Sequence, residues 1–168
     1  MHVVIIGGTG HVGTYLVPRL VTEGYTVTVI SRNKRKAYQP DPLWSAVNMV
    51  VLDREQLEQD GSFANEVRKL QPDIVIDMIC FTEESARMMV AGLAGNILHY
   101  LQCGSMWVHG YGVELPVEET DEKIPLCDYG YQKLAVEKYL LQVAAAEIFP
   151  ATVLHPGHIV GKGWAPVN

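Results

Sequence analysis

Short runs of β-branched residues alternate with longer amphipathic stretches along the chain, and this alternation predicts most of its secondary structure. The run at 2–6 (HVVII) is apolar at nearly every position, which is typical of a strand buried on both faces of a parallel sheet. Similar runs follow it along the chain. Strands are expected at 2–6, 25–31, 47–53, 73–77, 97–103 and 151–155.

Between these strands, apolar residues recur at helical spacing. Helices are expected at 12–23, 62–70, 83–93 and 129–147. Gly24 is placed to end the first helix, Pro18 inside it favours a kink, and Thr82 is a suitable N-cap for the third. Strands and helices in this order predict βαβ units with right-handed crossovers. The expected fold is therefore α/β, with a doubly wound parallel sheet of about six strands and helices on both faces.

Neither an internal repeat nor a linker divides the sequence, so residues 1–168 are expected to form one domain. The basic and then proline-bearing segment 33–42 is expected to be a surface loop. The stretch 110–128 is long for a connection and rich in acidic residues, which is typical either of a functional loop or of a solvated excursion. After the last expected strand the sequence contains no further helix, which favours a fragment or an unusually short protein.

Composition narrows the class of protein. A 48% hydrophobic and 19% charged composition excludes a mainly disordered chain. The net charge of −6 makes nucleic acid an unlikely partner, since binding it favours a basic footprint. No apolar run reaches the roughly 18–20 residues of a membrane span, and the first residues predict no secretion signal. The three cysteines and six histidines show no metal-site spacing, so no metal is expected. A cytoplasmic protein is predicted.

A glycine-rich turn follows the first expected strand directly and opens the first expected helix. Residues 7–13 read GGTGHVG, which satisfies both GxGxxG and GxxGxxG. The first glycine permits a turn at positive φ, the middle one lets the backbone approach a diphosphate, and the last allows close helix packing. The diphosphate is expected over the helix N-terminus, where free N–H groups favour negative charge. This context predicts dinucleotide binding, with a tight turn without ligand as the alternative.

The end of the second expected strand selects between NAD and NADP. An acidic residue there would bind the adenosine 2′-hydroxyl of NAD, but this chain has Ser31 followed by Arg32. A hydroxyl and a guanidinium suit a 2′-phosphate, so NADP is favoured over NAD, with a merely solvated basic loop as the alternative. Asp53 is placed either to accept a hydrogen bond from the adenine amino group or to cap a helix. His11 is placed to contact phosphate or to pack at the helix start.

Tyr129 and Lys133 begin the long expected helix four residues apart, so their side chains share one face. A tyrosine hydroxyl has a reference pKa of about 10, and a nearby lysine cation favours the phenolate. Ser105, just after the fifth expected strand, is placed to polarise a substrate oxygen and to steady the tyrosine. The three residues predict a proton-transfer site at the carboxyl edge of the sheet. A surface tyrosine and a solvated lysine are the alternative.

Taken together, GGTGHVG, Ser105, the Tyr129 and Lys133 pair, and HPGHIVG at 155–161 resemble the short-chain dehydrogenase/reductase superfamily. The similarity is to its extended or atypical branch, the NAD-dependent epimerase/dehydratase proteins that act on nucleotide sugars. The resemblance implies a Rossmann-type fold, Tyr129 as catalytic acid/base, Lys133 as its activator and ribose ligand, and Ser105 as the substrate-orienting hydroxyl. It also implies that 156–159 lie beside the nicotinamide carboxamide. The expected cofactor-binding residues are Gly7, Thr9, Gly10, His11, Val12, Gly13, Ser31, Arg32, Asp53, Lys133, Pro156 and His158.

Several positions depart from the pattern of that family. Its members usually continue into a smaller C-terminal substrate domain, so this sequence is expected to be the nucleotide-binding part only. His155 replaces the arginine of the usual Arg-Pro-Gly, and His109 replaces the tyrosine of the usual Val-Tyr-Gly. The segment 77–81 has larger side chains than are usual after the fourth strand. These departures keep a second function open: a non-catalytic cofactor-sensing or RNA-interacting protein, or an inactive fragment. The resemblance also implies a homodimer through the helices 83–93 and 129–147, with burial against a further domain as the alternative.

Overall fold

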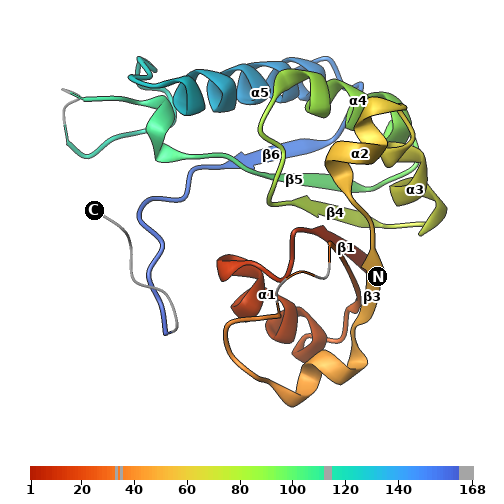
Figure 1. Ribbon diagram of the computed structural model, residues 1–168. Helices are drawn as coiled ribbons and strands as arrows, with labels where there is room; N and C mark the ends of the chain where they lie inside the picture. The colour runs from red at the N-terminus through yellow and green to blue at the C-terminus, as the bar shows by residue number, and fades with distance from the viewer. Residues whose placement is uncertain (33, 35, 112–114, 163–168) are drawn as a thin grey trace.

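The computed structural model describes residues 1–32, 34, 36–111 and 115–162, which build a parallel sheet with helices on both faces (Figure 1). Its strands are β1 (His2–Ile6), β2 (Thr26–Ser31), β3 (Asn48–Val51), β4 (Ile74–Asp77), β5 (His99–Cys103) and β6 (Ala151–Leu154), in the order β3-β2-β1-β4-β5-β6. All neighbouring strands pair in parallel. The predicted doubly wound sheet is confirmed. Its order reverses between β1 and β4, where ligands of such sheets bind outside the carboxyl ends of the strands.

The helices separate into two layers (Figure 1). Helix α1 (His11–Thr22) lies on one face, and α2 (Arg54–Gln59), α3 (Phe63–Lys69), α4 (Glu83–Leu93) and α5 (Asp128–Ala145) lie on the other. The predicted N-cap is confirmed, because the Thr82 hydroxyl accepts a hydrogen bond from the Ser85 N–H at 3.2 Å. Helix α1 continues through Pro18, which is buried.

Three short elements were not predicted. These are α2 and the 3-10 helices η1 (Pro42–Ala46) and η2 (Met106–Val108). Each is at most six residues long, too short for apolar residues to recur at helical spacing. The predicted loops 33–42 and 110–128 lie partly outside the described residues, at 33, 35 and 112–114.

Alternating side chains of β1 enter the two halves of the core. Val4 and Ile6 pack into the cluster under α3, α4 and α5, whereas Val3 and Ile5 pack into the cluster under α1. All of these side chains are almost completely buried. The continuous apolar run therefore reflects a central strand that is covered on both sides, as the sequence predicts.

A buried ion pair joins β4 to α2, and nothing in the sequence pattern predicted it. Arg54 Nη1 donates to both carboxylate oxygens of Asp77, at 2.9 and 2.8 Å, and Arg54 Nε donates to Glu58 at 2.6 Å. The Tyr100 hydroxyl donates to Asp77 at 2.7 Å. Burial and the neighbouring Asp77 raise the pKa of Tyr100 well above its ordinary value, so the phenol stays a donor. This network secures the carboxyl end of β4, from which the chain leads to the candidate site.

Tyr100→Phe tests that network, because it removes one hydrogen bond from the buried carboxylate of Asp77 and keeps the ring that packs on Phe149. We expect the free energy of unfolding to fall by about 1–3 kcal/mol, the cost of leaving a buried acceptor short of a partner. Urea denaturation measures the change. Tyr111→Phe, at a side chain that is 87% exposed, is the control and should cost about 0.5 kcal/mol or less. Equal small losses in both variants would contradict a stabilising role for the network.

Candidate active site

The turn between β1 and α1 is too tight to hold side chains at its glycines. Gly7 has a φ of +82°, which residues with a Cβ rarely adopt. A Cβ on Gly13 would overlap the carbonyl oxygen of Gly8, so α1 starts in contact with the turn only because position 13 has none. Gly10 is the N-cap and brings no side chain to the first-turn N–H groups, and that turn contains no acidic residue. A diphosphate could therefore lie close to the backbone of this turn, where free N–H donors and the helix dipole would favour its negative charge.

The predicted adenosine-binding residues lie at the ends of β2 and β3. Ser31 ends β2, and Arg32 directly after it is exposed. Asp53 is the N-cap of α2, and its carboxylate accepts a hydrogen bond from the Glu55 N–H at 3.2 Å. Of the two roles that the sequence left open for Asp53, the structure contains the capping one. The hydrogen bond occupies Oδ1 only, so Oδ2 is not engaged in it.

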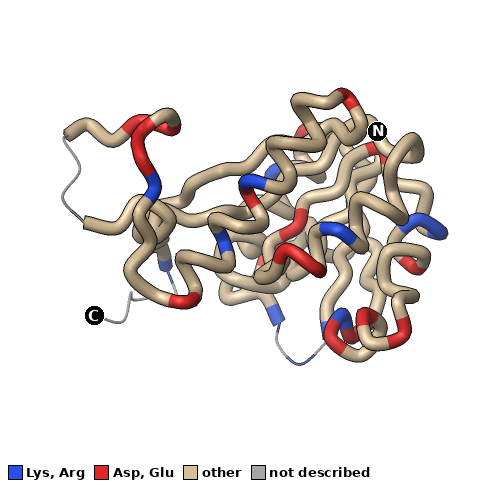
Figure 2. The backbone as a smooth tube through the Cα atoms, turned by 90° about the horizontal axis from the view of Figure 1, so that it is seen from above, with Lys and Arg blue, Asp and Glu red and all other residues tan. Residues whose placement is uncertain are grey.

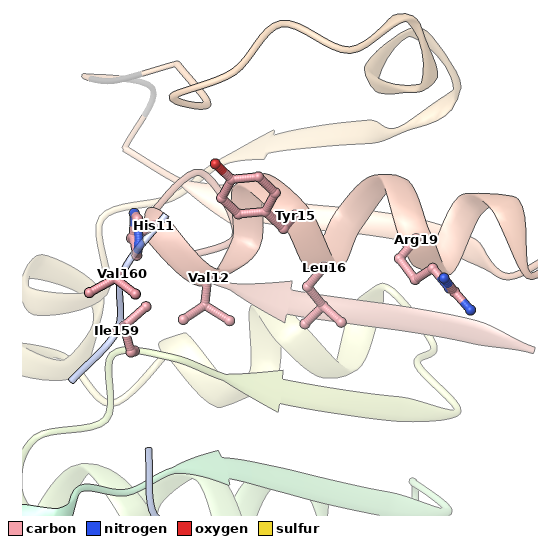
Figure 3. Close-up of a pocket in the computed structure, with 7 residues that line it drawn as sticks. All are labelled: His11, Val12, Tyr15, Leu16, Arg19, Ile159 and Val160. Atoms are coloured by element: carbon pink, nitrogen blue, oxygen red, sulfur yellow. The ribbon is translucent and has the colours of Figure 1, made fainter. Parts of the chain in front are cut away.

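The segment after β6 crosses to the start of α1. The Tyr15 hydroxyl donates to the carbonyl oxygen of Lys162 at 2.7 Å. A hollow of about 350 Å³ lies between the two segments. Figure 3 shows its lining residues, which are His11, Val12, Tyr15, Leu16, Arg19, Ile159 and Val160. The glycine turn and the segment 155–162 are thus brought together. Pro156 contributes its carbonyl oxygen to the Met106 N–H at 3.2 Å, and His158 is exposed.

Ser105 and Tyr129 lie beside each other, one after β5 and the other in the first turn of α5. Ser105 is the N-cap of η2, and its Oγ accepts a hydrogen bond from the Trp107 N–H at 3.2 Å. Because that bond uses a lone pair, the hydroxyl proton of Ser105 is available for the nearby phenol of Tyr129, whose pKa the Ser105 hydroxyl lowers. The Tyr129 side chain is 43% exposed, so its phenol is also accessible to a ligand.

Lys133 lies one helical turn after Tyr129 and is almost completely buried. Its Nζ donates to the carbonyl oxygens of Cys80 at 2.9 Å and Cys103 at 2.8 Å, and it lies 4.7 Å from the centroid of the Phe81 ring. Burial lowers the pKa of Lys133, and the neighbouring groups, Cys103 first among those that raise it, offset this only in part. An ammonium has three N–H donors, so one of them remains beyond the two carbonyl contacts.

The pKa of Tyr129 is raised, because burial disfavours the phenolate and the nearby Ser105 hydroxyl offsets this only in part. The sequence-based expectation assigned the lowering of this pKa to Lys133. In the structure the ammonium of Lys133 is 5.8 Å from the centroid of the Tyr129 ring and donates to two carbonyl oxygens. Tyr129 therefore carries its proton near neutrality and is equipped to act as an acid. Activation by Lys133 stays a prediction.

A chain of titratable side chains near Ser105 was not predicted to act together. His109 Nε2 lies 3.3 Å from His155 Nδ1, and His155 Nε2 lies 2.7 Å from Glu137 Oε2. Lys123 Nζ lies 3.3 Å from Glu137 Oε1. Glu137 follows Lys133 by four residues, and this spacing was the available signal for its position. The two histidines are 46 residues apart and meet only in the fold.

The strand order and the glycine turn define a Rossmann-type nucleotide-binding domain. Among the described residues, no group of three metal-ligating side chains could hold an ion. No helix in that part of the chain is long and apolar enough to cross a membrane. The chain belongs to the NAD dependent epimerase/dehydratase family, whose sequence profile matches residues 3–167.

Curated relatives are sugar-modifying enzymes. The 2'-dehydrokanamycin reductase of Streptomyces kanamyceticus is 31% identical over 138 residues, which cover 82% of this chain and 37% of the relative. The UDP-glucose 4-epimerase of Lactobacillus helveticus is 25% identical, with 96% of this chain and 52% of the relative covered. The chain thus spans about half the length, or less, of these two relatives.

Solved structures share the fold. UDP-glucose 4-epimerase from Brucella ovis in complex with NAD matches with a TM-score of 0.72 and 19% identity, covering 92% of this chain and 51% of that one. UDP-glucose 4-epimerase from Thermotoga maritima with UDP-glucose matches with a TM-score of 0.75 and 18% identity, covering 92% and 55%. At such identities the similarity establishes the architecture alone.

Ser105→Ala tests the contact between Ser105 and Tyr129. It removes the hydroxyl that lowers the pKa of the phenol, so we expect the pKa of Tyr129 to rise further above its ordinary value. The measurement is an NMR titration of the chain with ¹³C at tyrosine Cζ, with Tyr129 assigned from Tyr129→Phe. Ser45→Ala removes an exposed hydroxyl on η1 and serves as the control. A Tyr129 titration that is the same in both variants would rule the contact out.

Proposed function

We propose that this chain is the cofactor-binding and proton-transfer part of an NADP(H)-dependent oxidoreductase or a nucleotide-sugar epimerase/dehydratase-like enzyme. The observation that carries the proposal is the joint occurrence of two features at the carboxyl edge of one sheet. One is a glycine turn that leaves the first turn of α1 without a side-chain cap. The other is the Ser105 and Tyr129 pair, with the buried Lys133 one helical turn away.

NADP is the proposed cofactor, with NAD as the alternative. Family membership supports a nicotinamide dinucleotide, and the solved Brucella ovis relative is in complex with NAD. Ser31 in place of an acid, with Arg32, Lys34 and Lys36 exposed after it, supports a 2′-phosphate. When bound, the nicotinamide supplies the hydride acceptor or donor.

The side chains of the chain itself perform the remaining steps. Tyr129 gives its proton to a substrate oxygen in the reducing direction and takes a proton from the hydroxyl in the oxidising direction. Ser105 donates to the same oxygen or to the phenol and so orients the two. The remaining N–H of Lys133 binds a ribose hydroxyl of the cofactor, and its charge favours the phenolate when the proton has left.

A nucleotide sugar is the proposed substrate class, because the relatives include UDP-glucose 4-epimerases. Helices α4 and α5 are the proposed homodimer surface in a cytoplasmic protein. They flank a hollow of about 300 Å³ lined by Glu83, Arg87, Tyr131, Leu134, Ala135, Lys138, Tyr139 and Gln142. Sedimentation velocity of the chain tests this, and a monomer at all accessible concentrations would exclude the dimer.

A cofactor-binding protein without turnover is the second candidate, favoured by the unusual His109 and His155 pair near Ser105. An RNA-interacting version has less support. Figure 2 shows most basic residues dispersed among acidic ones along the described backbone, and the group Arg32, Lys34 and Lys36 after β2 is too short to form a stripe. A stripe or patch of Lys and Arg is the usual electrostatic footprint for nucleic acid.

The first test is binding of NADPH and NADH, measured by calorimetry. We expect saturable binding of both, with NADPH tighter. Arg32→Ala should weaken NADPH binding about tenfold or more and leave NADH nearly unchanged, because only NADPH has a phosphate for the guanidinium. Arg68→Ala removes an exposed cation of α3 and is the control. Absence of NADPH binding would defeat the proposal, and equal effects of Arg32→Ala on both cofactors would defeat the NADP preference.

The second test is turnover with nucleotide sugars, followed by the absorbance of the reduced nicotinamide and by product analysis. Tyr129→Phe should abolish turnover and leave NADPH affinity within about twofold, because the ring remains and only the transferable proton is lost. Cofactor binding without turnover by the unaltered chain would favour the second candidate. Binding lost in Tyr129→Phe would contradict the role given to the phenol.

A further inference from the structure

His109 and Ser105 belong to one short segment. Ser105 is the N-cap of η2 and His109 is its C-cap, so the segment 105–109 runs from the hydroxyl at Tyr129 to a histidine that is only 2% exposed. The segment lies along the chain that leaves β6. Gly104 N donates to the carbonyl oxygen of Leu154 at 2.8 Å, and Met106 N donates to that of Pro156 at 3.2 Å. The His109 contact with His155 joins the same two segments through side chains, at the far end from Ser105.

The hydrogen-bond partners determine which ring nitrogens of His109 and His155 carry a proton. Burial raises the pKa of Glu137, but His155 and Lys123 outweigh this and hold it below its ordinary value, so the carboxylate is ionised and accepts only. His155 Nε2 therefore donates to Glu137. In a neutral His155 this leaves Nδ1 as the acceptor for the N–H at His109 Nε2, 3.3 Å away. His109 Nδ1 is buried and has no hydrogen-bond partner among the described residues.

The number of protons on the two rings determines whether His109 and His155 can form a hydrogen bond. One added proton is compatible with an N–H···N bond, on whichever ring it resides. A second added proton places an N–H on both facing nitrogens, which removes the acceptor and sets two cations side by side. The contact between His109 and His155 is thus compatible with the neutral and the singly charged pair, and incompatible with the doubly charged pair.

The charges around the pair come from every element packed against it. His109 faces His155 after β6, Lys123 and Asp121 before α5, and Glu137 of α5. Burial, His155 and Lys123 lower the pKa of His109, against smaller opposing effects of Glu137 and Asp121. A histidine with a lowered pKa stabilises the fold above its unfolded pKa of about 6.5, and this contribution is lost as the pH falls through the folded pKa. Acid therefore destabilises the arrangement in which His109 contacts His155.

We propose that His109 and His155 are positioning residues for Ser105: their contact holds the segment 105–109 on the chain after β6, and full protonation of the pair releases it. Ser105 then moves away from the phenol of Tyr129 in acid. The catalytic consequence rests on the proposed function, whereas the movement of Ser105 does not.

The test is an NMR titration of the 168-residue chain from about pH 8 to about pH 5, which brackets the ordinary histidine pKa. Tyrosine Cζ is labelled with ¹³C and the histidine rings with ¹⁵N. We expect the Tyr129 signal to move with the second protonation of the His109 and His155 pair and not with the first, because only the doubly charged pair loses the contact. In His109→Gln the amide either donates to or accepts from His155 Nδ1, so the signal should stay at its high-pH position throughout. His109→Phe cannot make the contact, so the signal should stay near its acid position at every pH.

His2→Gln alters a histidine at the amino end of β1 and should keep the unaltered profile. Far-UV circular dichroism and NADPH binding verify folding, and His109→Gln carries the test if His109→Phe does not fold. A Tyr129 signal that does not change with the second protonation of the histidine pair would overturn the proposal. So would a pH-dependent change of that signal that persists in His109→Gln. Where turnover is measurable, kcat should fall in acid in the unaltered chain, with the KM for cofactor unchanged, and the fall should be absent in His109→Gln. Failure of NADPH binding with the Tyr129 step intact would defeat the proposed function alone.

Discussion

The buried ammonium of Lys133 is the interaction on which the candidate site depends. A cation removed from water needs compensating partners, and here the chain supplies the carbonyl oxygens of Cys80 and Cys103 and the face of Phe81. Cys103 ends β5, and Cys80 follows β4 by three residues. Satisfying this one charge therefore ties α5 to the carboxyl ends of two neighbouring strands. Tyr129, one turn earlier on α5, is brought beside Ser105 as a consequence.

Helix α5 acts as a spacer between separate parts of the site. Tyr129, Lys133 and Glu137 stand at intervals of four and share a face, and each contacts a different part of the sheet edge. Tyr129 contacts the segment after β5, Lys133 the ends of β4 and β5, and Glu137 the residue after β6. A shift of α5 along its axis would break all three contacts together. The position of the Tyr129 phenol and the histidine contact at Glu137 therefore depend on the same helix.

The sequence predicted what depends on local pattern and not what depends on long-range pairing. The apolar run of β1, the Thr82 cap and the glycine turn each have a local physical cause, and each is found in the structure. The partners of Lys133 are backbone carbonyl oxygens. Because every residue has one, no residue type in the sequence could indicate which carbonyls contact Lys133. Asp53 fitted two interpretations equally, because a strand-end acid and a helix cap occupy the same position. The short α2 after it reveals the capping role, and the adenine contact stays a prediction.

The bulky segment 77–81, unusual for the family that the sequence resembles, follows from the same constraint. Asp77 is neutralised from one side by Arg54. Phe81 covers the ammonium of Lys133 at 4.7 Å and lies 6.4 Å from the Tyr129 ring, centroid to centroid. A smaller residue at 81 would expose more of the ammonium and of the phenol to water, which would weaken the effect of burial on both pKa values. Burial raises the pKa of Tyr129, so the phenol is protonated. Burial also lowers the pKa of Lys133, so the neighbouring ammonium holds its proton less strongly than usual. The segment thus helps to set the protonation states of Tyr129 and Lys133.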